Sequence, residues 1–492
     1  MLEAIKNEAN MTYTENGAAT YESTGSECLD LFAAIGAIRR ESDDDIIRRF
    51  VRAYTENQDF AMKILFFARD VRGGLGERRV FRVIMNWLAT NEPETVKKNL
   101  KFVAEFGRFD DLLSLMGTPC EKAALDIIKS QYVEDVKALG EGGEVSLLGK
   151  WLPSVNASNA ETVRLGKKIA KALGLSDAEY RKSLTKLRAR IRIIENNLRE
   201  KDYTFDYEKQ PSRAMFKYRA AFMRNDEARY KAFLNAVNSG KAVLHTDNVS
   251  PYELVEPYLK GYSRRGIGNI PSDEKEALNT TWASLPDFGS EEDMLAVIDT
   301  SGSMYGYANP MPASVALSLG LYFAEHNRGA FRNHFIEFSR RPQLIEVKGD
   351  TFVDRLRYVA SFSEVANTNL EAVFDLILEA AVKNNIPQSE LPAKLVLISD
   401  MEFDECVDNA TSTIFQNAKA KFEANGYNLP QVVFWNVASR NIQQPVKQNE
   451  QGVALVSGAT PRLFSMIAGG ILSPYKFMIE VIENERYGKI AA

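Results

Sequence analysis

The hydrophobic periodicity of this chain changes once, near residue 290, and that change limits the folds available to it. From residue 28 to about residue 237, apolar residues recur every three or four positions, which places them on one face of an α-helix. Beyond residue 290, short apolar runs typical of buried strands alternate with helical segments. The sequence therefore predicts a multidomain protein: a helical region, then an α/β region with a doubly wound, mostly parallel sheet.

In the helical region, short helices joined by brief polar turns favour stacked helical pairs of the HEAT kind, although no clean sequence period is present. In the α/β region we expect strands at 295–298, 333–338, 343–347, 395–398, 432–436 and 453–456, and helices at 314–326, 370–383, 413–425 and 461–467. The expected domains are a flexible N-terminal arm (1–26), a helical-repeat module (27–270), a linker (271–290), the α/β domain (291–470) and a C-terminal tail (471–492) that packs back on the helical module.

Composition excludes several classes of protein. The 492 residues are enough for two to four domains, and 45% hydrophobic with 26% charged residues is typical of globular proteins. No apolar run approaches the roughly 18 residues of a membrane span, and no secretory leader is visible. Three widely spaced cysteines fit a reducing compartment and neither a disulfide framework nor a zinc site. We expect a cytoplasmic protein with no membrane partner.

A candidate metal site follows from polar residues at the ends of two apolar strands. Asp299, Ser301 and Ser303 form a D-x-S-x-S pattern directly after the first strand, and Asp400 ends a later one. Thr368 opens a helix between them. Carboxylate and hydroxyl oxygens are hard ligands that suit Mg²⁺, with Mn²⁺ or Ca²⁺ as alternatives. The serines could instead cap the following helix, but Thr368 and Asp400 favour a metal.

Positive charge is concentrated in one stretch although the whole chain carries −5. Residues 164–231 hold 19 Lys or Arg against nine Asp or Glu, a surplus that favours a polyanionic ligand. A glycine-rich turn at 72–79 adds three arginines, but it lacks the ending of a phosphate-binding P-loop. The candidate RNA contacts are Arg72, Arg78, Arg79, Lys182, Lys186, Arg188, Arg190, Arg192, Arg213, Lys217 and Arg219. The interleaved aromatics are spaced as core residues would be.

Four further motifs carry a family resemblance: FARDVRGGLGERR at 67–79, FGRFDDLL at 106–113, GKWLPS at 149–154 and PSRAMFKYR at 211–219. Together with the metal motif, they resemble the TROVE-like family, in which a helical module precedes a von Willebrand factor A domain, as in the Ro autoantigen proteins. The resemblance implies an RNA-binding helical ring and a metal-ion-dependent adhesion site at Asp299, Ser301, Ser303, Thr368 and Asp400. Where the family has glycine before the threonine, this chain has Asn367.

The expected function is thus a non-enzymatic, Ro-like scaffold that binds small non-coding or misfolded RNA. In A-type domains a carboxylate from a partner protein fills the open metal position, so a protein partner is also expected. One alternative is a protein–protein adaptor that uses the metal site without RNA. A metal-dependent nuclease is a weaker one, because no second acidic cluster accompanies Asp299. The sequence leaves open the RNA, the partner, the metal, the oligomeric state and whether the helices close into a ring.

Overall fold

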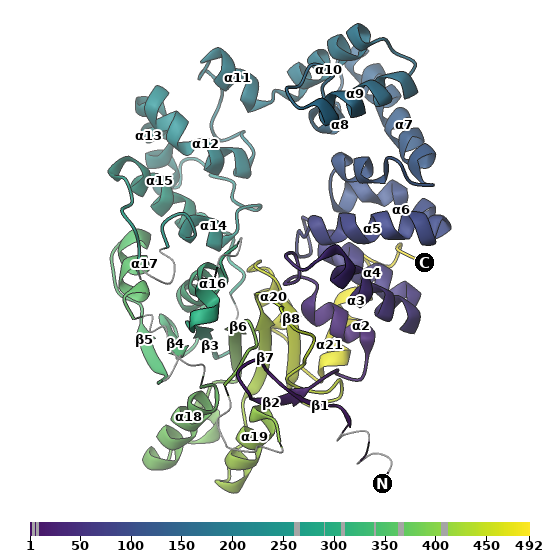
Figure 1. Ribbon diagram of the computed structural model, residues 1–492. Helices are drawn as coiled ribbons and strands as arrows, with labels where there is room; N and C mark the ends of the chain where they lie inside the picture. Colours follow the sequence, from purple (N-terminus) through teal and green to yellow (C-terminus); the bar gives the residue numbers. More distant parts are fainter. Residues whose placement is uncertain are drawn as a thin grey trace. The chain divides into compact units, whose positions relative to one another are not determined.

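The computed structural model describes residues 1, 5, 9–259, 266–289, 291–306, 310–338, 341–362, 369–404 and 412–492. The chain forms two compact units (Figure 1). The first unit comprises Met1–Ile64 and Pro211–Tyr487, and the second comprises Leu65–Gln210 and Gly488–Ala492. Each unit thus takes up two separate stretches of the sequence. Helix α4 (Gln58–Arg69) runs from the first unit into the second.

The first unit is built on a six-stranded sheet in the order β5-β4-β3-β6-β7-β8. All neighbouring strands are parallel except β4 and β5, which are antiparallel. The strands are β3 (Met294–Asp299), β4 (His334–Phe338), β5 (Gln343–Glu346), β6 (Lys394–Ser399), β7 (Gln431–Asn436) and β8 (Val453–Ser457). Every residue of β3, β6 and β8 is buried, because their apolar runs have helices or neighbouring loops on both faces. The predicted α/β fold class, with its mostly parallel sheet, is confirmed.

Helices surround this sheet. Helix α16 packs on β3, β4 and β6, and α18 lies beside α19 (Figure 1). The helices of the first unit are α2 (Glu27–Ala34), α3 (Asp43–Glu56), α12 (Ser212–Asn225), α13 (Glu227–Asn238), α14 (Pro251–Val255), α15 (Ser272–Ala283), α16 (Pro312–His326), α17 (Phe352–Ala360), α18 (Glu371–Asn384), α19 (Ile414–Ala424), α20 (Leu463–Ile467) and α21 (Pro474–Ile482), with short 3₁₀ turns η2 (Gly302–Tyr305) and η3 (Gln388–Glu390). Helix α17, capped by Thr351, was not expected from the sequence.

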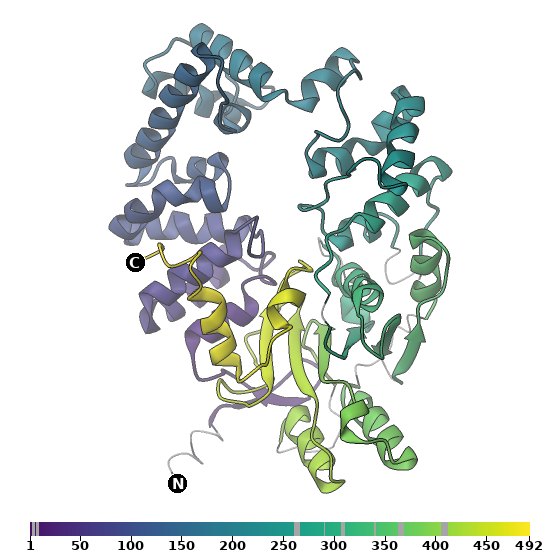
Figure 2. The same cartoon turned by 180° about the vertical axis from the view of Figure 1, so that it is seen from behind.

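The two ends of the chain also contribute to this part of the fold. Helix α21 packs against α2 and β8 (Figure 2). In this contact the Phe477 ring lies edge-to-face on Phe32. Near the N-terminus, β1 (Met11–Tyr13) and β2 (Ala19–Tyr21) form an antiparallel hairpin. The expectation of a flexible arm is wrong for this stretch, because the backbone of Tyr21 pairs with Gln444 in both directions, at 3.0 and 2.7 Å. These long-range hydrogen bonds order a segment that has no helical or strand-like sequence pattern of its own.

The second unit is entirely helical among its described residues. Its elements are α5 (Arg79–Asn91), α6 (Pro93–Phe106), η1 (Phe109–Leu115), α7 (Glu121–Gly140), α8 (Leu148–Trp151), α9 (Ala160–Ala172), α10 (Asp177–Ile191) and α11 (Ile194–Glu200). Helices that follow one another in sequence pack together, as α5 does with α6 and α6 with α7. Local signals set the ends of these helices: Ser176 and Glu179 form a reciprocal capping box that starts α10.

A buried ion-pair network links three elements of the second unit. Asp111 of η1 accepts hydrogen bonds from Arg69 Nε at 2.8 Å and from Arg82 Nε at 2.7 Å. The side chains of Arg69 and Asp111 are 2% and 0% exposed. A Cβ on Gly107 would lie 2.4 Å from the Asp111 carboxylate, so a glycine is required there. The FARD and GRFDD motifs therefore build a structural centre at the junction of α4, α5 and η1.

Replacing Asp111 with Asn should destabilise this junction strongly. The substitution leaves the buried Arg69 guanidinium without its counter-charge, a loss that costs about 3–5 kcal/mol in comparable buried pairs. Hydrogen exchange should therefore speed up throughout α5 and α6. The control is Lys97→Met, which removes only the exposed pair with Glu94 and should leave exchange unchanged. Equal exchange in the two variants would contradict a structural role for the network.

Candidate metal centre and basic surface

The parallel pairing of β3 with β6 brings the two predicted metal-binding carboxylates together. Met294 pairs with Lys394 and Ile298 with Ile398, so the two strands run in register and end side by side. Asp299 is the last residue of β3, and Asp400 directly follows β6. The sheet order reverses between these two strands, and ligands of open α/β sheets bind at that point beyond the carboxyl ends.

Asp299 is fully buried and held by two donors. Its Oδ2 accepts the Ser399 hydroxyl at 2.6 Å, and its Oδ1 accepts the Ser301 amide at 2.8 Å. Burial and then the nearby Asp400 carboxylate raise the pKa of Asp299 to about 7, while the two donors act in the opposite direction. A buried pair of like charges of this kind is relieved when a cation binds between them.

The hydroxyls of the two predicted serine ligands lie close together just after β3. The hydroxyl oxygens of Ser301 and Ser303 are 3.1 Å apart. Adjacent ligands around Mg²⁺, at about 2.1 Å from the ion in octahedral geometry, are themselves about 3.0 Å apart. The hydroxyls therefore fit one edge of such an octahedron, and the donor set of two carboxylates and two hydroxyls suits a hard divalent cation.

Asp400 already has a cationic neighbour. Arg440, in the loop after β7, donates from Nη2 to Asp400 Oδ2 at 2.9 Å, and the Glu402 amide lies 3.3 Å from Oδ1. A metal ion bound at Asp400 would share that carboxylate with the Arg440 guanidinium. Sequence reasoning missed Arg440, but β7 is the parallel neighbour of β6, so a charged residue just beyond its carboxyl end reaches the same edge of the sheet.

The fifth predicted ligand and the loop after Asp400 also bear on this site. Thr368, the fifth predicted ligand, lies outside the described residues. Glu402, in the loop after β6, accepts hydrogen bonds from Asn441 and Gln443 at 2.8 and 2.9 Å. Burial is the main cause that raises the pKa of Glu402. Within the described ranges no cluster of three or more His, Cys, Asp or Glu residues converges on one point, so hydroxyl oxygens would have to complete the coordination of a metal.

Several predicted RNA contacts are engaged inside the fold. Arg188 donates to the carbonyls of Gly149 and Leu152 at 2.9 and 2.8 Å, and burial lowers its pKa. Arg219 is paired with Glu274 at 2.9 Å. For Arg188 and Arg219 a structural role thus replaces the expected one. Four other predicted contacts are also engaged: Arg72 donates to the Glu105 carbonyl, Arg190 to the carbonyls of Gly142 and Gly143, Arg213 pairs with Glu253, and Lys217 lies over the Tyr218 ring.

The remaining cations lie exposed on the second unit. Lys182 and Lys186 are four residues apart on α10, on one helix face, and Arg192 caps its C-terminus. In the part of the chain that the structure describes, none of these three side chains makes a hydrogen bond or an ion pair. Arg78 and Arg79 are also exposed, and burial followed by the neighbouring Arg108 and Arg82 lowers the pKa of Arg78.

Two aromatic residues of the basic segment lie in the core. Phe222 and Tyr230 are buried and pack edge-to-face at 5.3 Å between ring centroids. Their helical spacing thus reflects the core of the first unit, as the sequence indicated.

Comparison with known protein families shows which family the chain belongs to. A family described as a domain of unknown function, DUF2828, matches residues 14–137 and 121–287, which together make up more than half of the chain. The chain belongs to the DUF2828 family. A second domain of unknown function, DUF7788, matches residues 293–476, the stretch that contains the parallel sheet and both carboxylates. The boundary between the two matches coincides with the change of periodicity near residue 290.

A relative of this DUF2828 chain is known from a giant virus. Uncharacterized protein L728 of Acanthamoeba polyphaga mimivirus is 28% identical over 517 aligned positions, covering 96% of this chain and 88% of the relative. Among solved structures, the crystal structure of the Deinococcus radiodurans RO (RSR) protein is similar with a TM-score of 0.40 and 14% identity, covering 93% of this chain and 95% of the other. None of the described helices is long and apolar enough to cross a membrane.

Replacing Asp299 or Asp400 with Asn should abolish divalent-cation binding at this edge. Each substitution removes a charged ligand, and even outer-shell substitutions weaken metal affinity about 10–100-fold. Titration of the full chain with Mn²⁺, followed by electron paramagnetic resonance, measures the number of bound ions. The matched control is Asp375→Asn, which removes a surface carboxylate that pairs with Lys421. Retention of the bound ion in both site variants would contradict this assignment.

Proposed function

We propose that this chain is a non-enzymatic RNA-binding scaffold with Ro-like architecture, whose α/β domain holds a divalent cation, most readily Mg²⁺. The RNA would be a small non-coding or misfolded RNA bound by the helical part of the chain. The cation would be held by Asp299, Ser301, Ser303 and Asp400, with Thr368 as the further ligand that the TROVE-like resemblance implies. A protein partner would supply a carboxylate to the open coordination position.

The observation that carries the RNA proposal is the exposed cationic surface of α10. Lys182, Lys186 and Arg192 have no hydrogen bond or ion pair among the described residues, although carboxylates are abundant in the sequence. Hydrogen bonds from Ser176 lower the pKa of the Glu179 carboxyl and nearby Lys182 lowers it further, but the Lys182 ammonium group is exposed like the other two cations. Exposed cations are available to phosphates, and binding to phosphates releases counterions. The unit that bears this surface is also the one that contains the FARD, GRFDD and GKWLPS motifs of the TROVE-like resemblance.

The metal proposal is supported by position and by chemistry. Asp299 and Asp400 meet at the point where the strand order reverses, and two hydroxyls lie beside them at the spacing of adjacent metal ligands. With so few protein charges around it, a bound cation would retain its attraction for an external carboxylate. The chemistry there would be recognition, with the cation acting as a bridge between two acidic surfaces.

A second candidate is a protein–protein adaptor that uses the metal edge without RNA. It is supported by the basic residues that already form ion pairs with carboxylates or hydrogen bonds with backbone carbonyls, such as Arg188, Arg213 and Arg219. The two candidates differ in what α10 does: an RNA scaffold needs its free cations, and an adaptor does not.

Reversing the charge of Lys182, Lys186 and Arg192 together, each to Glu, should strongly weaken RNA binding. The measurement is fluorescence anisotropy of the full chain with a labelled 20-nucleotide single-stranded RNA and with a labelled RNA hairpin, over a range of salt concentrations. Each lost phosphate contact should reduce the slope of log K against log salt by about 1, so a reduction of about 3 is expected.

The matched control changes three exposed basic residues that have carboxylate partners and are not predicted RNA contacts, Lys209, Arg229 and Lys231, each to Glu. This control reverses the same number of charges, so long-range repulsion is equal and only the position differs. The RNA affinity of the control should exceed that of the α10 variant by about tenfold. Equal affinity in the two variants, or no salt-dependent RNA affinity in the wild type, would favour the adaptor.

A further inference from the structure

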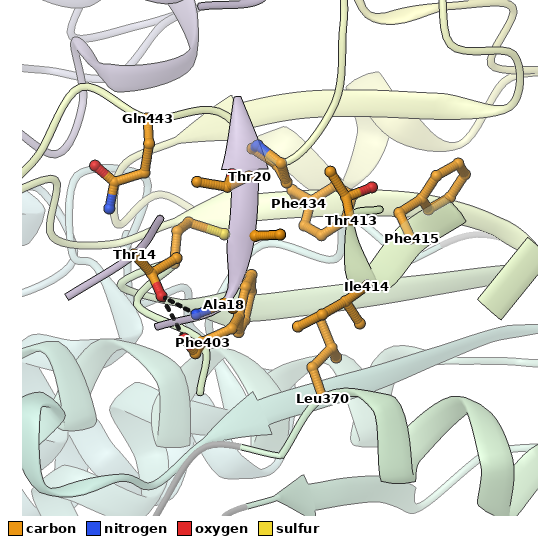
Figure 3. Close-up of a pocket in the computed structure, with 13 residues that line it drawn as sticks. Thr14, Ala18, Thr20, Leu370, Phe403, Thr413, Ile414, Phe415, Phe434 and Gln443 are labelled. Atoms are coloured by element: carbon orange, nitrogen blue, oxygen red, sulfur yellow. Dashed lines mark hydrogen bonds between the residues drawn. The ribbon is translucent and has the colours of Figure 1, made fainter. Parts of the chain in front are cut away.

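The turn of the β1–β2 hairpin is docked on the loop that follows the candidate metal ligand Asp400. The Thr14 hydroxyl donates to the Phe403 carbonyl at 2.5 Å and accepts the Ala18 amide at 3.0 Å (Figure 3). The Asn16 side chain donates to the Glu402 carbonyl at 2.7 Å. Gly17, with φ +89°, forms an antiparallel bridge with Asp404. The turn therefore pairs with residues 402–404 much as an added strand would.

This turn carries a carboxylate to the metal edge. The Glu15 amide donates to Glu402 Oε2 at 2.9 Å, and the Glu15 carboxylate lies 3.3 Å from Arg440 and accepts Asn441 Nδ2 at 3.0 Å. The same Arg440 guanidinium donates to Asp400 at 2.9 Å. Arg440 is thus shared between a carboxylate of the hairpin and a carboxylate of the candidate metal site.

The turn and the base of the hairpin are held by different contacts. The base has the two backbone hydrogen bonds between Tyr21 and Gln444. The turn has the bridge between Gly17 and Asp404 and the side-chain hydrogen bonds of Thr14 and Asn16. The Glu15 side chain is 49% exposed. A cavity of about 20 Å³ remains beneath the hairpin, between Ala18 and Thr20 on one side and Phe403 and Phe434 on the other (Figure 3). Lifting the turn would expose the buried hydrogen bond between Thr14 and Phe403 to water, whereas the half-exposed Glu15 carboxylate already contacts solvent.

We propose that the surface formed by residues 402–404, Arg440 and Asn441 binds an acidic peptide segment of a partner protein, in the place that the turn of the hairpin now fills. The partner segment would pair with residues 402–404 through its backbone and place a Glu or Asp beside Arg440. The inference rests on the proposed function in one respect, since it takes the edge at Asp299 and Asp400 as the recognition surface. The hairpin then competes with the partner for the same surface, so only a segment that also carries a suitably placed Glu or Asp would displace it.

The experiment measures binding of a labelled peptide with this chain's own sequence from Ala9 to Ser23 to the full-length protein. In the protein variant Thr14→Val/Asn16→Ala, the side-chain hydrogen bonds that hold the turn are absent. Because the surface is then free for a larger fraction of the time, the peptide should bind about tenfold more tightly to the variant than to the wild type. A peptide carrying Glu15→Gln should lose most of this affinity, and one carrying Glu22→Gln should retain it.

The matched control protein is Thr55→Val/Asn384→Ala, in which the same residue types are changed where they bond only to carbonyls of their own helices. Its peptide affinity should equal that of the wild type. Because a variant can fail to fold, hydrogen exchange is also measured on the wild-type protein. A saturating concentration of the peptide should accelerate exchange of the Glu15 amide, which now donates to Glu402. Absence of peptide binding, or binding that ignores the Glu15→Gln change, overturns the proposal.

Failure of this inference is separable from failure of the proposed function. In one outcome, the protein binds no Mn²⁺, but the peptide binds in EDTA and its binding depends on Glu15. That result supports the acidic-peptide surface and contradicts the metal centre. Mn²⁺ binding that depends on Asp299, without displacement of the hairpin by the peptide, retains the metal centre and overturns the peptide surface. RNA affinity is measured on α10 variants and does not enter either result.

Discussion

The parallel pairing of β3 with β6 is the interaction on which the candidate site depends. It aligns two buried strands residue for residue from Met294 to Ile298, so that Asp299 and the residue after Ser399 emerge at one edge of the sheet. Burial raises the pKa of Asp299, and the nearby Asp400 carboxylate raises it further. The nearby hydroxyls offer further oxygens to a cation.

The same edge is also where distant parts of the first unit meet. Arg440 comes from the loop after β7, Glu15 from the N-terminal hairpin and Asp400 from the end of β6. The three charges form a row in which one guanidinium serves two carboxylates. A ligand that brings another charge can replace one of these three groups as a partner of the others. The surrounding loops would then move, while the hydrogen bonds of the sheet remain intact.

In the second unit, buried charged side chains stabilise the fold, whereas exposed ones are accessible to a ligand. Arg69, Arg82 and Asp111 form a desolvated network, so their motifs serve the fold. Lys182 and Lys186 lie on the solvent side of α10. The arginines of the first group and the lysines of the second all appear as basic residues in the sequence. A surplus of Lys and Arg over 164–231 likewise cannot distinguish a cation that holds a carbonyl, as Arg188 does, from one that is available to a phosphate.

The sequence by itself determined the change from helices to an α/β sheet, the strands that carry Asp299 and Asp400, and the capping signals of helices such as α10, because these depend on local periodicity and on side chains a few residues apart. Only the tertiary structure decided that the N-terminal segment would be an ordered hairpin, that Arg440 would reach Asp400, and which arginines would be engaged inside the fold. These contacts join residues tens or hundreds of positions apart, and no local pattern encodes which long-range pairings a chain will make.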